Sequence, residues 1–230
     1  MTHNVHNHGN AHAHGDEAQL VELLELDGEL IGHYLDEATA WVETYAPAAP
    51  RAVIDIGAGT GSGSIALARR FDRADIVAVD NSATLLDRLR AAVGERQLTH
   101  RVRGVQADLD EGWPDIGAVD VVWAASSLHH ITDPDRMLRD AYRALNPGGV
   151  LVVTEIDGLQ GFLPDDVGRG RPGLERRCHE ALAQQGWNAY PDWGPHLERA
   201  GFSIAGRHTF TVTATSANIA RYAHAYLSRI

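Results

Sequence analysis

The sequence contains no lysine, so all 20 of its basic residues are arginine. A Schiff base requires a lysine amine, and its absence excludes pyridoxal-phosphate enzymes and lysine-dependent aldolases. The same absence excludes nucleoside triphosphatases with a phosphate-loop lysine and protein kinases, which position ATP with a lysine. Several large classes of enzyme are thereby removed.

Cysteine and basic charge are also scarce. Cys178 is the only cysteine in the 230 residues, and we expect it to be an inert buried thiol. One thiol cannot form an intrachain disulfide, hold an iron–sulfur cluster or build a cysteine-rich zinc site. The arginines are outweighed by 31 Asp and Glu, which gives a formal net charge of -11. Nucleic acids and anionic membranes are bound by basic surfaces, so we expect neither as a partner.

Long apolar runs are missing too, and the longest ones are of strand length. Without a membrane-spanning or signal-like segment, the chain is expected to be cytoplasmic. Residues 1–15 hold five histidines without a regular spacing. We interpret them as a disordered tail with no specific metal site, because nothing there specifies a coordination geometry. Metal binding by the tail is the alternative.

An N-terminal helical cap is predicted for residues 16–47, where apolar residues recur at three- and four-residue steps. Gly28 and Gly32 are expected to divide or weaken this helix near its middle, because glycine is a poor helix former. Pro47 and Pro50 end the segment.

From residue 51 to residue 156, apolar strands alternate with helices. The strands are predicted at residues 52–56, 75–79, 101–106, 119–124 and 150–155. Ser82 and Asp133 are placed to cap the helices that follow them, and Asn146-Pro147-Gly148-Gly149 predicts a stop and a turn. This alternation predicts an α/β fold with a doubly wound, mostly parallel sheet covered by helices on both faces.

The alternation of strands and helices ends after residue 156. Residues 157–201 combine a loop rich in Gly, Pro and Asp with short predicted helices, and we interpret them as a substrate-side insert. Residues 202–214 alternate with period two, which predicts one long strand, the sixth of the chain. The segment that follows is predicted to be helical, so residues 202–230 form a sixth strand and a terminal helix.

A glycine loop joins the first strand to the helix after it, in the order Asp55-Ile56-Gly57-Ala58-Gly59-Thr60-Gly61. Glycines at this point allow a tight turn and the close approach of a ligand. The dinucleotide fingerprint requires a glycine three residues after the second one, and Ser62 or Ser64 occupies that position in the two registers. The spacing therefore disfavours NAD and FAD.

The spacing D-x-G-x-G-x-G instead resembles the first motif of class I S-adenosylmethionine-dependent methyltransferases. The resemblance extends over residues 51–156: Asp80 ends the second strand, Asp108 follows the third, and the blocks at 119–131 and 145–155 are similar to the family's fourth- and fifth-strand blocks. It implies a Rossmann-like methyltransferase fold and S-adenosyl-L-methionine as cofactor, with S-adenosyl-L-homocysteine as product. The cofactor-binding residues that it implies are Asp55, Gly57, Gly59, Gly61, Asp80, Asp108 and Leu109.

Each of these residues also has a purely structural interpretation. Asp55 could be a helix-side charge, Asp80 could cap a helix, and Asp108 could be a solvated loop charge. Their joint occurrence at the carboxyl ends of successive strands, where open α/β sheets bind ligands, favours the cofactor site.

The reaction implied by the resemblance is the in-line transfer of a methyl group to O, N or C of a small-molecule acceptor. The fourth-strand block lacks the Asn-Pro-Pro-Tyr type of sequence found in enzymes that methylate DNA or protein amides. His129 follows the fourth strand and Glu155 ends the fifth, and these strands are neighbours in the family. We predict that His129, oriented by Glu155, accepts a proton from the acceptor; the alternative is that the histidine shapes its loop and Glu155 lines the pocket.

Two other functions compete with this hypothesis. One is a non-catalytic or regulatory protein that binds S-adenosylmethionine in the same fold; binding without turnover would favour it. The other, an NAD-dependent oxidoreductase, would be favoured only by tighter binding of NAD. The family also has a seventh, antiparallel strand between strands five and six, which we do not find in the sequence. We therefore expect a truncated form, in which residues 202–214 are displaced, pair differently or are completed by another chain.

Overall fold

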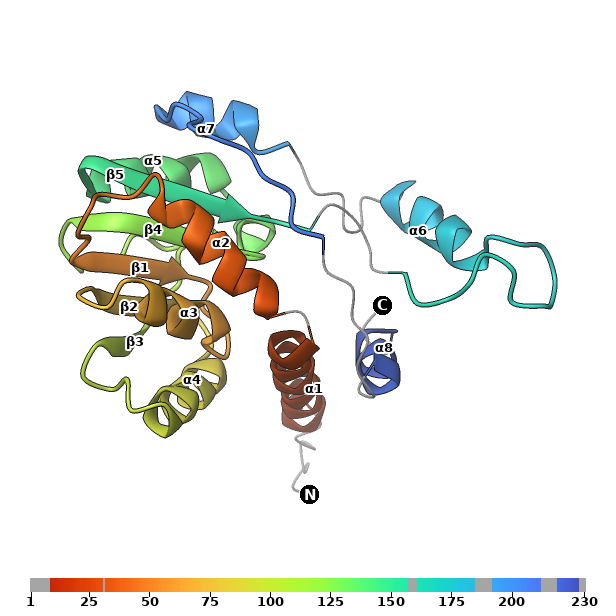
Figure 1. Cartoon of the computed structure of the whole chain (residues 1–230). Coiled ribbons are helices and arrows are strands. Elements are labelled where there is room, and N and C mark those ends of the chain that lie inside the picture. Colours follow the sequence, from red (N-terminus) through yellow and green to blue (C-terminus); the bar gives the residue numbers. More distant parts are fainter. Residues whose placement is uncertain (1–8, 31, 157–160, 185–191, 212–218, 228–230) are drawn as a thin grey trace, which may run out of the picture.

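The computed structural model of the chain describes residues 9–30, 32–156, 161–184, 192–211 and 219–227. At its centre is one sheet of five parallel strands in the order β3-β2-β1-β4-β5 (Figure 1). The strands are β1 (Ala52–Ile56), β2 (Asp75–Asp80), β3 (Val102–Gln106), β4 (Val119–Ala125) and β5 (Leu145–Thr154). The predicted α/β core with a parallel sheet is thus confirmed.

The order of the strands fixes where a ligand can bind. β1 lies between β2 and β4, so the chain moves outward to β3 and then returns across β1 to build the other half of the sheet. The connections after β1 and β4 consequently leave the sheet in opposite directions. In open parallel sheets a crevice forms at this switch point, outside the carboxyl ends of the strands.

Helices cover both faces of the sheet, because each strand is apolar on both sides. Val53 of β1 faces one core with α2 (His33–Glu43), α3 (Ser62–Arg70) and α4 (Ala83–Glu95). Its neighbours Ile54 and Ile56 face a second core with α5 (Pro134–Ala144) and α7 (Gly194–Ala200). All three strand residues are at most 1% exposed, and the two-sided burial holds the strand ends rigidly in place.

The N-terminal helices differ in part from the prediction. α1 spans Gly9–Leu30 and α2 begins at His33, so the chain is divided near Gly32 as expected. However, residues 9–15 are helical, and the predicted disordered tail over 1–15 is wrong for that part; residues 1–8 lie outside the described residues. No proline interrupts residues 9–15, and adding a turn to an existing helix costs far less than nucleating one.

The predicted turn at residues 146–149 is absorbed into β5, which begins directly at Leu145. The register jumps here, since Val119 pairs with Leu145 and Val121 pairs with Val150. Asp120 of β4 stabilises the bulge: its carboxylate accepts a hydrogen bond from Asn146 Nδ2 at 2.8 Å. A bulge accommodates the extra residues that would otherwise need a turn.

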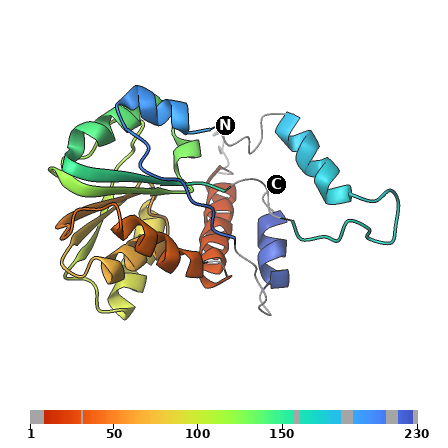
Figure 2. The same ribbon diagram turned by 45° about the horizontal axis from the view of Figure 1, so that its top comes forward.

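The predicted sixth strand at 202–214 is wrong for residues 202–211, which form no strand; residues 212–214 lie outside the described residues. The segment runs extended past β5 toward α2 (Figures 1 and 2). Aromatic side chains near its two ends pack on helices, Phe202 on Tyr142 of α5 and Phe210 on Tyr34 of α2. The two-residue alternation of apolar and polar side chains is therefore that of an extended segment which is not part of a sheet. Among the described residues, none forms a sixth strand beside β5.

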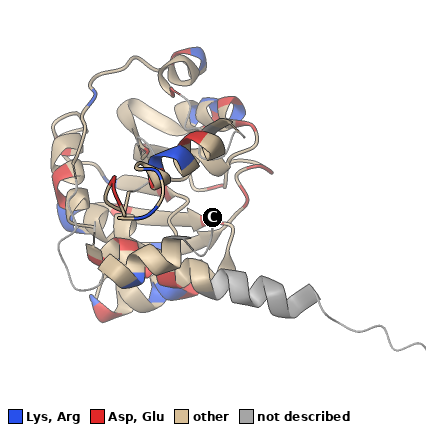
Figure 3. Cartoon of the chain, turned by 90° about the vertical axis from the view of Figure 1, so that its right-hand side faces the viewer, with Lys and Arg blue, Asp and Glu red and all other residues tan. Residues whose placement is uncertain are grey.

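Two further helices complete the C-terminal part. α6 (Leu174–Gln184) follows the loop after β5 and lies away from the sheet, while α8 (Ile219–Leu227) packs beside α1 (Figures 1 and 2). Cys178 is exposed on α6, so the expectation of a buried thiol is wrong. Acidic and arginine residues are mixed along the outer helices (Figure 3).

Two other kinds of feature are absent from the described residues. None of the helices in the described ranges combines the length and apolarity that crossing a bilayer requires. Within those same ranges, no three His, Cys, Asp or Glu side chains are grouped so that they could hold a metal ion.

Candidate functional site

A deep cleft opens at the carboxyl ends of the strands, at the switch point between β1 and β4. Its volume is about 1970 Å³, compared with ~300–1,000 Å³ for the pocket of one small molecule. Residues after β1, β2, β4 and β5 form its floor, α1 and α2 form one wall, and residues 202–210 close another side. The cleft is large enough for two small ligands to lie side by side.

The glycine loop forms the floor of the cleft below β1. Gly57 has a φ of +67°, and a Cβ on it would lie 2.4 Å from Ser127 Cβ. Gly61 has a φ of +93°, and a Cβ there would lie 2.8 Å from Leu89 Cγ. Side chains at either position would be strained and would collide with neighbours. These glycines are therefore required for the loop to pass between Ser127, which follows β4, and Leu89 of α4.

Asp80 lies where the sequence predicted, at the end of β2, and it is 8% exposed. One carboxylate oxygen accepts a hydrogen bond from Gly59 N at 2.9 Å, and the other accepts one from Ser82 N at 2.9 Å. A carboxylate has about four acceptor positions, so two remain for ligand hydroxyls. Asp80 thus connects the glycine loop to the start of α4 and also borders the cleft.

Asp108 and Leu109 follow β3 and form the far end of the cleft. Asp108 is exposed and accepts a hydrogen bond from Asp110 N at 2.8 Å, whereas Leu109 is 7% exposed and packs in the second core. The loop after β3 is also tied to the loop before α5, because Asp110 accepts hydrogen bonds from Thr132 N and Oγ1. The structure therefore gives the end of β3 a polar edge beside an apolar surface.

Asp55 is 3% exposed, below the glycine loop, and accepts a hydrogen bond of 2.6 Å from Ser64 Oγ. Burial raises the pKa of Asp55 to about 7; the hydrogen bond from Ser64 opposes this rise, and the nearby charge of Asp80 adds to it. Near neutral pH this carboxyl group is therefore partly protonated, and a cation bound in the cleft would favour its ionised form.

This burial makes a testable contribution to stability. Between pH 3.8, the ordinary pKa of the group, and about pH 7, folded Asp55 keeps a proton that the unfolded chain releases, so stability falls as pH rises. At about 1.4 kcal/mol per pKa unit, the loss is on the order of 1–4 kcal/mol. Thermal unfolding at several pH values should show that Asp55→Asn gains stability over the parent chain from pH 5 to pH 8. Parallel curves for the two proteins would contradict this assignment.

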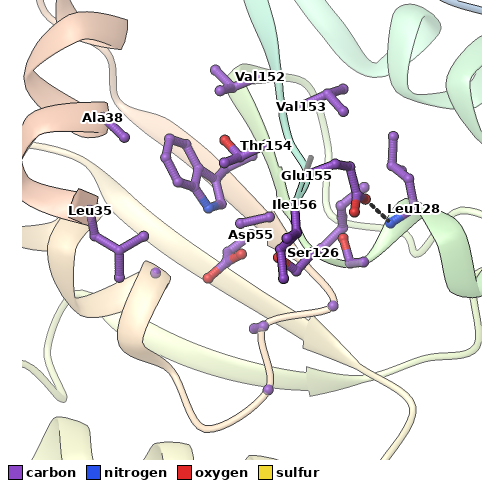
Figure 4. Close-up of a pocket in the computed structure, with 18 of the residues that line it drawn as sticks. Leu35, Ala38, Asp55, Ser126, Leu128, Val152, Val153, Thr154, Glu155 and Ile156 are labelled. Atoms are coloured by element: carbon purple, nitrogen blue, oxygen red, sulfur yellow. Dashed lines mark hydrogen bonds between the residues drawn. The ribbon is translucent and has the colours of Figure 1, made fainter. Parts of the chain in front are cut away.

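His129 and Glu155, predicted as a pair, are in contact: His129 Nδ1 lies 2.8 Å from Glu155 Oε2. The other carboxylate oxygen of Glu155 accepts a hydrogen bond from Leu128 N at 3.1 Å (Figure 4). Glu155 borders the cleft and its side chain is 8% exposed. It therefore orients the imidazole ring and the backbone of the turn after β4 together.

The two adjacent histidines differ in their relation to the cleft. His130 borders it and is exposed, whereas His129, with a side chain 22% exposed, does not belong to the cleft wall. Their ring centroids are 4.0 Å apart. A ligand in the cleft beyond the ends of β4 and β5 would thus contact His130 and Glu155 directly. His130 is therefore a second candidate for the proton acceptor.

Residues that no motif identified also border the cleft. Asp27 of α1 accepts a hydrogen bond of 2.5 Å from Tyr222 of α8, so these distant helices meet at the edge of the cleft. Tyr34 of α2 is nearby, and burial together with the charges of Asp27, Asp55 and Glu155 raises its pKa to about 12. Tyr34 is therefore a neutral hydroxyl group. The docking of α8 on α1 brings Asp27 and Tyr222 together, and the sequence carries no sign of that docking.

Comparisons with known proteins agree with this geometry. Residues 54–153 match the family model of a methyltransferase domain. The chain is 36% identical over 101 residues to a trans-aconitate 2-methyltransferase of Azoarcus sp.; the matched region covers 44% of this chain and 37% of the relative. It is 35% identical over 104 residues to a ubiquinone/menaquinone biosynthesis C-methyltransferase of Idiomarina loihiensis, covering 45% and 41% of the two chains. The match thus spans well under half of these relatives.

Two further matches cover more of the chain. A malonyl-[acyl-carrier protein] O-methyltransferase of Methylovorus sp. is 28% identical over 161 residues, or 67% of this chain and 51% of the relative. The crystal structure of a putative O-methyltransferase from Nostoc punctiforme superposes with a TM-score of 0.60 at 21% identity, over 80% of this chain and 54% of that one. At that identity the structural match supports the fold alone.

Proposed function

We propose that this chain, whose residues 54–153 match the model of a methyltransferase domain, is a class I S-adenosylmethionine-dependent enzyme that transfers a methyl group to a small-molecule acceptor. The observation that carries the proposal is the placement of the glycine loop, Asp80 and Asp108 along a single cleft, in the order of the strand ends. The residues fit such a cofactor: the backbone of Gly57 and Gly59 borders the cleft without side chains, and the carboxyl groups of Asp80 and Asp108 border it further along.

The strand order suggests how the cofactor would lie. The adenine end would rest at β3 against Asp108 and Leu109, and the ribose hydroxyls would bind Asp80 at β2. The amino-acid end would then reach the glycine loop between β1 and β4. The part of the cleft beyond the ends of β4 and β5, beside Glu155 and His130, remains for the acceptor.

The bound cofactor would supply the electrophilic methyl group, and this chain would supply alignment and proton transfer. A phenol or enol acceptor becomes a better nucleophile when a base removes its proton. With Nδ1 of His129 donating to Glu155, Nε2 is the nitrogen that accepts the proton. Glu155 would fix this tautomer and stabilise the resulting charge; for a neutral amine, alignment alone would suffice.

The charge of the cleft narrows the acceptor class. Its described wall contains one guanidinium group, on Arg207, which lies 3.6 Å from Asp192. The same wall contains seven carboxyl groups, those of Asp27, Asp55, Asp80, Asp108, Asp110, Glu155 and Asp192. An anionic acceptor would be repelled by this surface, so the acceptor is neutral or cationic at its reacting end.

A transfer assay tests this proposal. The chain is incubated with labelled S-adenosylmethionine and a panel of phenols, enols and amines, with trans-aconitate included as the tricarboxylate acceptor. We expect S-adenosylhomocysteine to form with neutral or amine acceptors and not with trans-aconitate. Methylation of trans-aconitate would contradict the charge argument. Cofactor binding without turnover on any acceptor would favour the alternative, a non-catalytic protein that binds S-adenosylmethionine.

A further inference from the structure

Asp27 of α1 presents one carboxylate oxygen to the cleft without a partner. Its Oδ1 accepts the hydrogen bond of 2.5 Å from Tyr222 of α8. Its Oδ2 has no partner among the described residues, and it is not one of the atoms there that are both buried and without a partner. Asp27 itself is half-buried and borders the cleft. A ligand in the cleft can therefore reach Oδ2.

The surroundings of this carboxylate are apolar. Leu26 and Leu30 of α1 form a buried cluster with Tyr222, on which Phe162 packs. Among the described residues, no arginine or histidine forms an ion pair with Asp27. Burial raises the pKa of Asp27, and the hydrogen bond from Tyr222 opposes that rise. A carboxylate in such surroundings is poorly hydrated, so a cation beside it is bound more strongly than it would be in water.

The contacts of Tyr222 connect Asp27 to the acceptor side of the cleft. Phe162, which follows Glu155 in the loop after β5, borders the cleft, and its ring centroid lies 5.9 Å from that of Tyr222. The backbone N–H of Phe162 donates to Glu175 of α6 at 2.9 Å, which fixes this part of the loop. Tyr222 thus joins Asp27 to the chain that leaves β5, whereas the proposed cofactor site follows the ends of β3, β2 and β1.

We propose that the Asp27 carboxylate binds an ammonium group of the acceptor, and that this group is separate from the atom that receives the methyl group. A guanidinium group pairs best with both oxygens of a carboxylate, and Tyr222 already occupies Oδ1, so an ammonium group suits the site better. A protonated amine has no lone pair with which to attack a methyl group, so the nucleophile is another atom of the same molecule. This inference rests on the proposed function and narrows its acceptors to molecules that carry an ammonium group beside a neutral nucleophile.

The test uses two pairs of probes that differ only in the ammonium group. Tyramine is compared with 4-ethylphenol, and 4-(2-aminoethyl)aniline is compared with 4-ethylaniline. Calorimetry on the full chain saturated with S-adenosylhomocysteine measures the affinity for each probe, so no methyl transfer is needed. We expect the parent chain to bind the ammonium member of at least one pair about tenfold more tightly, the effect of one hydrogen bond between charged groups.

Asp27→Asn keeps the shape of the side chain and an oxygen for Tyr222 but removes the charge. It should lower the affinity ratio within the pair about tenfold, to near one. Glu25→Gln removes an exposed carboxylate of the same helix outside the cleft and is the matched control, for which the ratio should equal that of the parent. Circular dichroism verifies that both variants are folded.

Three results would overturn the role of Asp27. The first is a parent chain that prefers the ammonium member in neither pair, and this measurement needs no variant. The second is a folded Asp27→Asn variant that keeps the parent's ratio. The third is a loss of affinity for S-adenosylhomocysteine in Asp27→Asn without a change of the ratio, which would assign the carboxylate to the cofactor. Failure of the parent chain to bind S-adenosylhomocysteine would instead reject the proposed function.

Discussion

Replacing Asp80 with alanine is expected to weaken the binding of S-adenosylhomocysteine by about tenfold or more while the chain stays folded. A hydrogen bond to a charged group contributes roughly 1.5–3 kcal/mol, and about 1.4 kcal/mol changes an affinity tenfold. Asp80 would lose its contacts to the ligand and also its hydrogen bond to Gly59 N, which positions the glycine loop. Two contributions to binding are thus removed together, so we expect one of the largest effects on affinity.

The matched control is Asp75→Ala, at the exposed opposite end of the same strand. It removes the same charge from the chain without touching the cleft, so the affinity should remain that of the parent. Calorimetry on the three proteins, with circular dichroism to verify folding, measures the difference. A folded Asp80→Ala variant with the parent's affinity would contradict the placement of the ribose at β2.

The largest effect on turnover is expected at the His129–Glu155 pair. A positioned base typically contributes about 10²–10⁴-fold, so His129→Ala should lower turnover by that factor and leave the affinity for S-adenosylhomocysteine nearly unchanged. Glu155→Gln should also lower turnover, because the neutral amide no longer stabilises a protonated imidazole ring 2.8 Å away. A transfer assay and calorimetry on the parent chain and the two variants measure turnover and affinity.

His130→Ala provides the comparison within the same turn. His130 borders the cleft and His129 does not, so the two variants show which of the histidines accepts the proton. A large loss in His130→Ala with little change in His129→Ala would assign the base to His130. Equal and small losses in both would show that the histidines shape the turn and that the reaction proceeds by alignment alone.

Local signals predicted much of the fold. Short segments containing Val, Ile or Leu predicted all five strands, and their alternation with helices predicted the parallel sheet. The caps were also readable: Ser82 Oγ accepts a hydrogen bond from Leu85 N, and Asp133 accepts one from Arg136 N. These features depend on residues within a few positions of one another, where side-chain chemistry and periodicity act directly.

Features that depend on contacts between distant parts of the chain could not be predicted from the sequence. Residues 202–211 have the alternation of a strand, but their apolar side chains pack on α2 and α5, and alternation cannot reveal whether a neighbouring strand exists. The bulge at residues 146–149 depends on Asp120, which is on another strand. The loop chemistry of Asn-Pro-Gly-Gly predicted a turn, and the tertiary contact overrode it.

The same division applies to the candidate site. The glycine loop, Asp80, Asp108 and the His129–Glu155 pair all lie at strand ends, where the order of strands predicts that they meet. Asp27 and Tyr222 carry no motif, since their contact depends on the docking of α8 onto α1. The difference in exposure between His129 and His130 is likewise a property of the folded turn.

The central claim is that this cleft binds S-adenosylmethionine, and calorimetric titration of the full chain with S-adenosylhomocysteine tests it most directly. The account predicts saturable binding to a single site, which is lost or strongly weakened in Asp80→Ala and retained in Asp75→Ala. NAD, whose glycine fingerprint the loop lacks, should bind more weakly or not at all. The absence of binding by S-adenosylhomocysteine, or tighter binding of NAD, would contradict the account.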